Sequence, residues 1–122
     1  MNALTDTDVS DEYIRLRRQF FDGIPKRLNR INQFIQEIGH VDLEERYNSL
    51  ESLHYEVHKL TGASGSYGYS DIESLARSLE ERIFQHLSTA QQSIICTQQV
   101  DRYVEFITLI NKVYTQLKNS NN

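Results

Sequence analysis

The stretch HKLTGASGSYG, residues 58–68, begins with a histidine and carries three glycines after it. An imidazole can act as a nucleophile, a proton carrier or a metal ligand. Gly62, Gly65 and Gly68 are three of only five glycines in the 122-residue chain. Each glycine inside a helix costs about 1 kcal/mol relative to alanine. Glycines placed at this cost beside His58 indicate that another protein must reach its ring.

Helical periodicity places His58 on the solvent side of its helix. With about 100° of rotation per residue, the core arc of this helix is defined by Leu53, Val57, Leu60 and Ser64. His58 lies roughly 120° from the centre of that arc, and Gly65 and Gly62 lie about 20° and 40° from the histidine. We therefore expect these two glycines to clear the approach to an exposed imidazole. Gly68 follows at the helix end, where a left-handed cap is expected.

The apolar spacing of the whole chain predicts helices and no sustained strand. Apolar residues recur every three or four positions, which is the pattern of an amphipathic helix with one buried face. The expected core positions are Ile24, Leu28, Ile31, Ile35 and Ile38 in the second helix, Ile72, Leu75, Ala76, Leu79, Ile83 and Leu87 in the fourth, and Val100, Val104, Ile107, Ile110, Tyr114 and Leu117 in the last. The predicted helices span residues 11–21, 24–38, 42 into the glycine stretch, 70–87, and Ala90 or Thr97 to Lys118. Short connections between long helices favour antiparallel neighbours. We therefore predict an all-α, up-and-down four-helix bundle with an additional short N-terminal helix.

Local signals predict the helix ends and the domain bounds. Gly23 and Pro25 should break or kink the join between the first two helices. Gly39 is expected to end the second helix in the left-handed conformation. Ser70 and Glu73 have the spacing of a capping box at the start of the fourth helix. We expect one domain, with a flexible N-terminus at 1–10, the bundle at 11–118 and a polar tail at 119–122.

Composition and charge narrow the class of protein. The formal net charge of −4 argues against nucleic-acid binding, which favours a basic face. No apolar run approaches a membrane span, and residues 1–13 lack the apolar centre of a signal peptide. Cys96 is the only cysteine and cannot form an internal disulfide, so we expect a cytoplasmic protein in which Cys96 is a small buried residue. We also expect a monomer.

The residues from His58 to Glu81 resemble the histidine phosphotransfer (HPt) domain of phosphorelay signalling. In that family a helical histidine is followed by an apolar residue, a glycine, a small residue, an apolar residue and a second glycine at fixed spacings. The positions are filled in register by His58, Leu60, Gly62, Ser64, Tyr67 and Gly68. The run IESLARSLEE, residues 72–81, matches the family's following helix, and the helical layout agrees over the rest of the chain.

The resemblance implies that His58 accepts a phosphoryl group from the aspartate of a receiver domain and passes it to another receiver. Response-regulator receiver domains are the implied partners, and a hybrid histidine kinase is a candidate partner. No cofactor is expected on this chain, because the receiver supplies the Mg²⁺ that phosphoryl transfer requires. The residues expected to face the docked receiver are His54, Tyr55, Gly62 and Gly65.

One position departs from the family pattern. Members often carry a lysine three residues after the histidine, close to the phosphoryl group, whereas this chain has Thr61 there. Thr61 could donate one hydrogen bond to the phosphoryl group without supplying charge. Lys59, rotated about 100° from His58, is the lysine whose long side chain could compensate in part.

The same residues suggest three functions other than phosphotransfer: a histidine kinase, a metal site and a binding adaptor. A histidine kinase is excluded, because the chain has no room for an ATP-binding domain and residues 62–68 lack the lysine and hydroxyl residue of a P-loop. His54 and His58 have the spacing of a zinc pair, but a third ligand would have to come from His40 or His86 by tertiary contact, so no metal site is predicted. A receiver-binding helical adaptor without phosphotransfer stays open as an alternative function.

We interpret one basic group as a solvated helix face rather than a partner patch: Arg15, Arg17, Arg18, Lys26, Arg27 and Arg30.

Overall fold

A computed structural model describes residues 6–40, 42–88 and 97–120, and within these ranges the chain has no strand. The helices are α1 (Asp6–Asp22), α2 (Ile24–Ile38), α3 (Leu43–Ser66), α4 (Ser70–Ser88) and α5 (Thr97–Ser120). The all-α prediction is confirmed. Ala90 and Cys96 lie outside the described residues. None of the described helices combines the length and the apolar character needed to cross a membrane.

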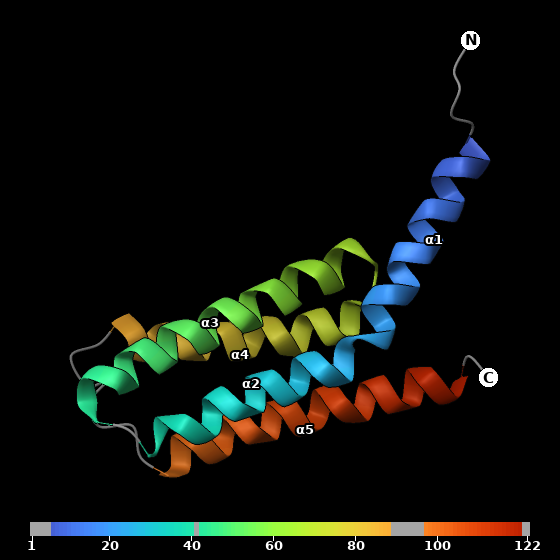
Figure 1. Ribbon diagram of the computed structural model, residues 1–122. Helices are drawn as coiled ribbons and strands as arrows, with labels where there is room; N and C mark the ends of the chain where they lie inside the picture. Colours follow the sequence, from blue (N-terminus) through green and yellow to red (C-terminus); the bar gives the residue numbers. More distant parts are fainter. Residues whose placement is uncertain (1–5, 41, 89–96, 121–122) are drawn as a thin grey trace.

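Helices α2 to α5 form the bundle, and α1 extends beyond it (Figure 1). The chain reverses direction between successive helices of the bundle, as the up-and-down prediction requires (Figure 1). α3 packs against α2 and α4, and α5 packs against the same two helices, so the four close into a ring. α1 and α2 are separated at Gly23, as predicted. α1 begins earlier than expected, so residues 6–10 are helical.

Periodic apolar positions build the core. All the predicted positions of α2 are buried: Ile24, Leu28, Ile31, Ile35 and Ile38. From α3 and α4 come Leu50, Leu53, Val57, Leu60, Ile72, Ala76, Leu79 and Ile83. Burying one large aliphatic side chain stabilises the fold by roughly 1.5–3 kcal/mol. This interior therefore holds α3 rigidly against its neighbours.

α5 enters the core differently from its sequence pattern. Tyr103, which was not among the predicted core positions, is fully buried. Its hydroxyl forms a hydrogen bond with Nδ1 of His86 on α4, so its polar end is satisfied inside the protein. Burial raises the pKa of Tyr103 and lowers the pKa of His86, which the nearby Arg82 lowers further. Four predicted positions are only half-buried: Val100, Val104, Ile107 and Leu117.

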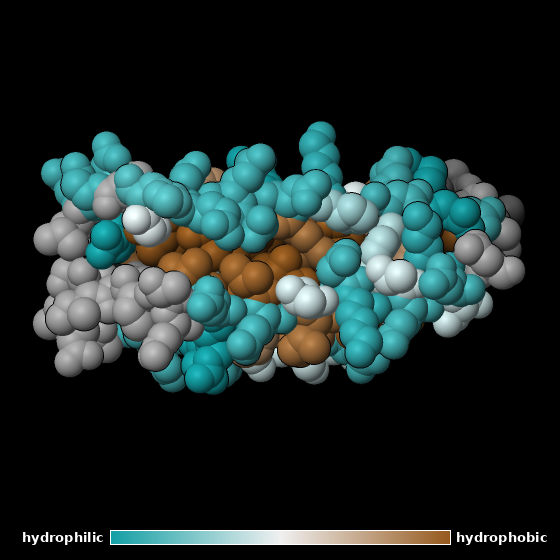
Figure 2. All heavy atoms as spheres, turned by 90° about the horizontal axis from the view of Figure 1, so that it is seen from below, coloured by the Kyte–Doolittle hydropathy of each residue, from teal (hydrophilic) through white to brown (hydrophobic). Residues whose placement is uncertain are grey.

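Apolar side chains reach the surface on one side of the bundle. Seen from below, the middle part of the molecule carries an apolar band between rows of polar side chains (Figure 2). Such a band fits the half-buried apolar positions of α5, because a helix that buries only its central stripe leaves the flanks of that stripe in contact with water.

The C-terminal half of α1 is held by the connection between α3 and α4. Arg17 Nε donates to Tyr67 O at 2.8 Å, and the Arg17 guanidinium lies 4.5 Å from the centre of the Tyr69 ring. Phe20 stacks on Tyr67 with ring centroids 5.4 Å apart, and Phe21 packs on Tyr69. Arg17 therefore ties α1 to this connection, although its side chain stays exposed.

The glycines that end helices behave differently from one another. Gly68 has a φ of +80°, as expected for a left-handed residue after α3. Gly39 was expected to be left-handed as well, but its φ is −83°. The N–H of His40 donates to Glu37 O at 3.0 Å, so α2 closes with a tight right-handed turn and needs no left-handed residue.

The capping box predicted at Ser70 and Glu73 is also wrong. α4 begins with Ser70 itself, and the carbonyl of Tyr69 accepts the N–H of Glu73 at 2.9 Å. The Glu73 carboxylate lies 2.8 Å from Arg77 Nη2, one turn further along the helix. The Glu73 carboxylate is thus engaged in an ion pair with Arg77 and does not cap the start of the helix.

The two helix-end glycines give a matched test of this difference. Gly68→Ala should destabilise the protein by about 1–2 kcal/mol, because an L-residue is strained in the left-handed region. Gly39→Ala is the control, since its backbone is right-handed and a Cβ there meets no atom within 4 Å. We expect the control to be neutral or to gain up to about 1 kcal/mol. Urea midpoints measure both, and equal destabilisation of the two variants would contradict the assignment.

Candidate functional site

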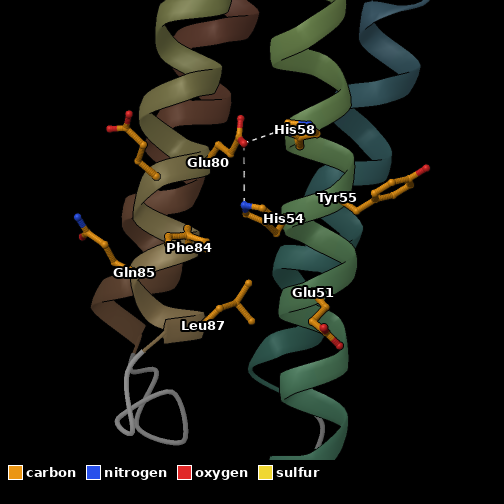
Figure 3. Close-up of a pocket in the computed structure, with 9 residues that line it drawn as sticks. Glu51, His54, Tyr55, His58, Glu80, Phe84, Gln85 and Leu87 are labelled. Carbon is orange, nitrogen blue, oxygen red and sulfur yellow. Dashed lines mark hydrogen bonds and ion pairs between the residues drawn. The ribbon is translucent and has the colours of Figure 1, made fainter.

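His58 lies on α3, on the edge of that helix that faces α4 (Figure 3). Its side chain is 66% exposed, so the solvent-side position predicted from the helical wheel is confirmed. Val57 and Leu60 on the same helix are fully buried, which fixes the orientation of this face. A side chain on a well-packed helix is presented at a fixed place, which suits a group that a partner must reach.

Glu80 of α4 hydrogen-bonds the imidazole of His58. Glu80 Oε2 lies 2.7 Å from His58 Nδ1, and only 19% of the glutamate side chain is exposed. An ionised carboxylate only accepts hydrogen bonds, so the neutral imidazole carries its proton on Nδ1 and keeps a lone pair on Nε2. Nε2 is therefore the nitrogen able to act as a nucleophile.

The sequence prediction missed Glu80, although a signal for it was present. The short connection around Tyr69 makes α3 and α4 an antiparallel pair. His58 precedes Tyr69 by as many residues as Glu80 follows it. The two residues therefore lie opposite each other on the antiparallel helices. The same rule pairs Gly65 with Glu73. Only the pairing of two helices, and no spacing along one helix, reveals these partners.

His54 lies one turn before His58 and shares its carboxylate. His54 Nε2 is 3.9 Å from Glu80 Oε2. The two imidazoles are stacked, with ring centroids 6.3 Å apart and 13° between their planes. His54 also contacts Phe84 of α4, with 5.9 Å between ring centroids. The structure thus brings His54, which the sequence assigned to a docking face, directly beside His58.

A groove of about 920 Å³ runs between α3 and α4 beside the two histidines (Figure 3). It is lined by Glu51, His54, Tyr55, His58, Glu80, Glu81, Phe84, Gln85 and Leu87. Two aromatic side chains at the groove are largely exposed, Tyr55 by 61% and Phe84 by 57%. Exposed aromatic groups gathered beside a reactive side chain are typical of a surface that another molecule covers. Tyr55 was expected here; Phe84 was missed because it lies outside the glycine stretch.

The structure does not bring Lys59 and Thr61 to the His58 ring. Thr61 is buried, and its hydroxyl donates to Val57 O at 3.0 Å. The expected hydrogen bond from Thr61 to a phosphoryl group is therefore wrong, because this position of the helix faces the core. Lys59 Nζ is 3.2 Å from Glu56 Oε1 and lines a second groove, between α2 and α3. Its charge is thus engaged on the opposite flank of α3.

The two glycines near His58 serve different purposes. Gly62 is exposed, and a Cβ built there meets no atom within 4 Å, so it leaves open space on the histidine face. A Cβ at Gly65 would collide with the carboxylate of Glu73 on α4. Gly65 is exposed as well, so its expected place facing the partner stays a prediction; within the protein it leaves room for the end of the Glu73 side chain.

The described residues offer little support for a metal centre. Nowhere in the described ranges are three or more His, Cys, Asp or Glu side chains grouped to hold a metal ion. His86 hydrogen-bonds Tyr103 instead of joining the other histidines, and His40 is an exposed residue after the end of α2. Neither His40 nor His86 therefore joins His54 and His58 as the third histidine that the zinc alternative required.

Removing the Glu80 carboxylate should release the imidazole of His58 from its single tautomer. In Glu80→Ala we expect a mixture of Nδ1–H and Nε2–H forms, whereas the unchanged protein holds the proton on Nδ1. Glu81→Ala is the control, because Glu81 also lines the groove without a contact to either histidine nitrogen. Long-range ¹⁵N–¹H spectra of the histidine ring report the tautomer directly. An identical spectrum in Glu80→Ala would show that the carboxylate does not set it.

The relation of this chain to known proteins agrees with the geometry. The family model of the Hpt domain matches residues 15–120, from within α1 to the last residue of α5. Neither the curated proteins nor the solved structures contain a match. The matched range includes His58, Glu80 and all of the bundle. Because the match spans most of the 122 residues, the chain belongs to the Hpt domain family, whose members carry phosphoryl groups on a histidine in phosphorelay signalling.

Proposed function

We propose that Nε2 of His58 accepts a phosphoryl group from the aspartate of one receiver domain and passes it to the aspartate of another. The observation that carries this proposal is the exposed imidazole with its Nδ1 on the Glu80 carboxylate. It combines an accessible lone pair with a fixed ring orientation, and these are the requirements of a nucleophile that works on a partner's substrate.

The transfer step balances without any further reactant. The Nε2 lone pair attacks the phosphorus of the aspartyl phosphate, an N–P bond forms, and the P–O bond to the aspartate breaks. The aspartate leaves as a carboxylate, and the imidazole gains a positive charge with its proton still on Nδ1. Glu80 faces that proton at 2.7 Å, so its negative charge stabilises the charge that develops on the ring. Onward transfer runs through the same bonds in reverse.

The receiver brings the remaining electrostatic components. Phosphoryl transfer needs cations around the equatorial oxygens, usually Mg²⁺ together with a basic side chain. In this chain Lys59 is paired with Glu56 and Thr61 is buried, so neither is placed for that task. The receiver therefore supplies Mg²⁺ and the charge around the phosphoryl group, and this domain supplies the nucleophile and a docking surface of Tyr55 and Phe84.

Replacing the proposed acceptor tests the assignment. His58→Gln should abolish transfer from a phosphorylated receiver, because no lone pair remains to form the N–P bond, while stability stays within about 0.5 kcal/mol. The unchanged protein should acquire acid-labile label from a phospho-receiver and none from ATP alone. Gel electrophoresis after incubation with a labelled phospho-receiver, or with labelled ATP alone, shows in each case whether this chain carries label. Label retained by His58→Gln, or stoichiometric labelling by ATP without a kinase, would contradict the proposal.

Gly62 allows docking and folding to be separated. Gly62→Ala should gain up to about 1 kcal/mol of stability, because the site is helical and a Cβ there meets no neighbour. Gly62→Gln should also fold, but its side chain would fill the open space beside His58 and slow transfer.

Ser78→Gln, an exposed position on α4, is the control for adding the same side chain elsewhere. Thermal midpoints and transfer rates are measured for all three variants. Loss of stability in both Gly62 variants would mean that this glycine serves packing instead of docking.

A further inference from the structure

A second groove lies on the other flank of α3, between that helix and α2. Its volume is about 820 Å³, close to that of the groove beside His58. Four cationic side chains line it against two carboxylates: Lys26, Arg27, Arg30 and Lys59 against Glu37 and Glu56. We propose that this groove binds an acidic stretch on the surface of the receiver that docks at His58. The inference rests on the proposed function and extends it to the choice of partner.

The positive charge of the groove is only partly neutralised within the protein. Glu56 is buried, and its Oε1 lies 3.2 Å from Lys59 Nζ and 3.4 Å from Arg30 Nε. One carboxylate therefore serves two cations. In the described parts of the chain, Lys26 and Arg27 form no ion pair with a carboxylate; Arg27 instead lies over the ring of Phe20 at 5.4 Å. The groove is thus locally basic although the chain has a net charge of −4.

The structure divides the basic residues that the sequence grouped together. Arg15 is paired with Glu12, and Arg17 is bound to the α3–α4 connection. Lys26, Arg27 and Arg30 instead converge on the groove, where Lys59 joins them from another helix. For this half of the group our proposal departs from the interpretation as a solvated face, because a cation from α3 completes a concave basic surface.

The walls of the groove suit a protein segment. Phe20 is buried and Phe34 is half-buried at this site, and they give it an apolar component among the charges. Gln19, Asn29 and Gln33 add hydrogen-bonding side chains. A segment with acidic residues and one apolar side chain would match both components, and opposite charges across an interface chiefly raise the association rate and fix the register.

The two grooves are joined across the crest of α3. Lys59 Nζ lies 4.7 Å from the centre of the Tyr55 ring, and Tyr55 lines the groove beside His58. A partner that covers His58 and Tyr55 therefore reaches Lys59 next. Proteins hold Mg²⁺ mainly with carboxylates, so a receiver carries acidic side chains near its reactive aspartate, close to the surface that covers His58 and Tyr55. That chemistry makes the receiver itself the occupant of the basic groove.

Charge reversal in the groove tests the proposal. The variants are Lys26→Glu and the double variant Lys26→Glu/Arg27→Glu, and the control is Lys112→Glu, an exposed lysine on α5. Phosphorylated receiver domains from the same genome that transfer to the unchanged protein are the probes. We expect the receiver concentration at half-maximal rate to rise roughly tenfold in the double variant and less in the single one. The maximal rate should stay within about twofold, because His58 and Glu80 are untouched.

High salt and a binding measurement without phosphoryl transfer give two further tests. At about 0.5 M salt, where the Debye length is only about 4 Å, the variants and the control should converge. Calorimetric binding of the unphosphorylated receivers should weaken by the same factor in the double variant and stay unchanged in Lys112→Glu. Thermal midpoints verify that each variant is folded.

Three outcomes would overturn the proposal. One is the same half-maximal concentration in the double variant and in Lys112→Glu. Another is a lower maximal rate with unchanged binding, which would place these cations in the chemical step. The third is a dimer of the unchanged protein that the double variant loses, which would make a second copy the occupant. Binding of receivers without any transfer to His58 would instead contradict the proposed function, and the calorimetric comparison would still decide the role of the groove.

Discussion

The hydrogen bond between the Glu80 carboxylate and Nδ1 of His58 is the contact on which the site depends, and it exists only because α3 and α4 pair in one register. The connection between the helices sets that register. Gly68 adopts the left-handed conformation that lets the chain reverse within a few residues, and the tyrosines on either side of it are packed by Phe20 and Phe21 of α1. α1 thus contributes to the site although it extends beyond the bundle.

The pairing of α3 with α4 also explains why one helix tolerates glycines so close together. Gly65 lets the Glu73 carboxylate approach the backbone of α3, and Glu73 in turn pairs with Arg77. Gly62 has no such neighbour and leaves an opening at the surface. The same cost in helix propensity therefore supports packing at one position and access at the next. Both positions lie on the flank of α3 that carries His58.

Much of the fold was predictable because it follows from local periodicity. The apolar positions of α2 and α4, the exposure of His58 and the left-handed Gly68 all depend on residues close together in the sequence. The failures share a different cause. The partner of His58, the burial of Tyr103 beside His86 and the approach of Glu73 to Gly65 are all decided by contacts between helices. A helical wheel drawn for one helix does not contain them.

The residues after His58 show the same limit in a functional context. The family pattern directs attention to the position of Thr61, which the wheel placed outside the core arc, but the structure buries this side chain. Its hydroxyl donates to Val57 O, so a residue that the motif suggested for contact with phosphate is part of the core. Lys59 likewise forms an ion pair with the buried Glu56, because an unpaired carboxylate there would destabilise the fold.

These two assignments give the site a consistent asymmetry, in which the nucleophile is held firmly and the phosphoryl group is not. In the proposed function such an asymmetry is useful, because a carrier must release its group as readily as it accepts it. Strong binding of the phosphoryl oxygens by this chain would lower the free energy of the phosphohistidine and raise the barrier to onward transfer. With the charge around the phosphoryl group left to the receiver, the barrier falls only while a partner is docked. The choice of partner then depends on the surfaces flanking His58, which differ in kind: exposed aromatic side chains line the groove beside His58, and cations line the groove between α2 and α3.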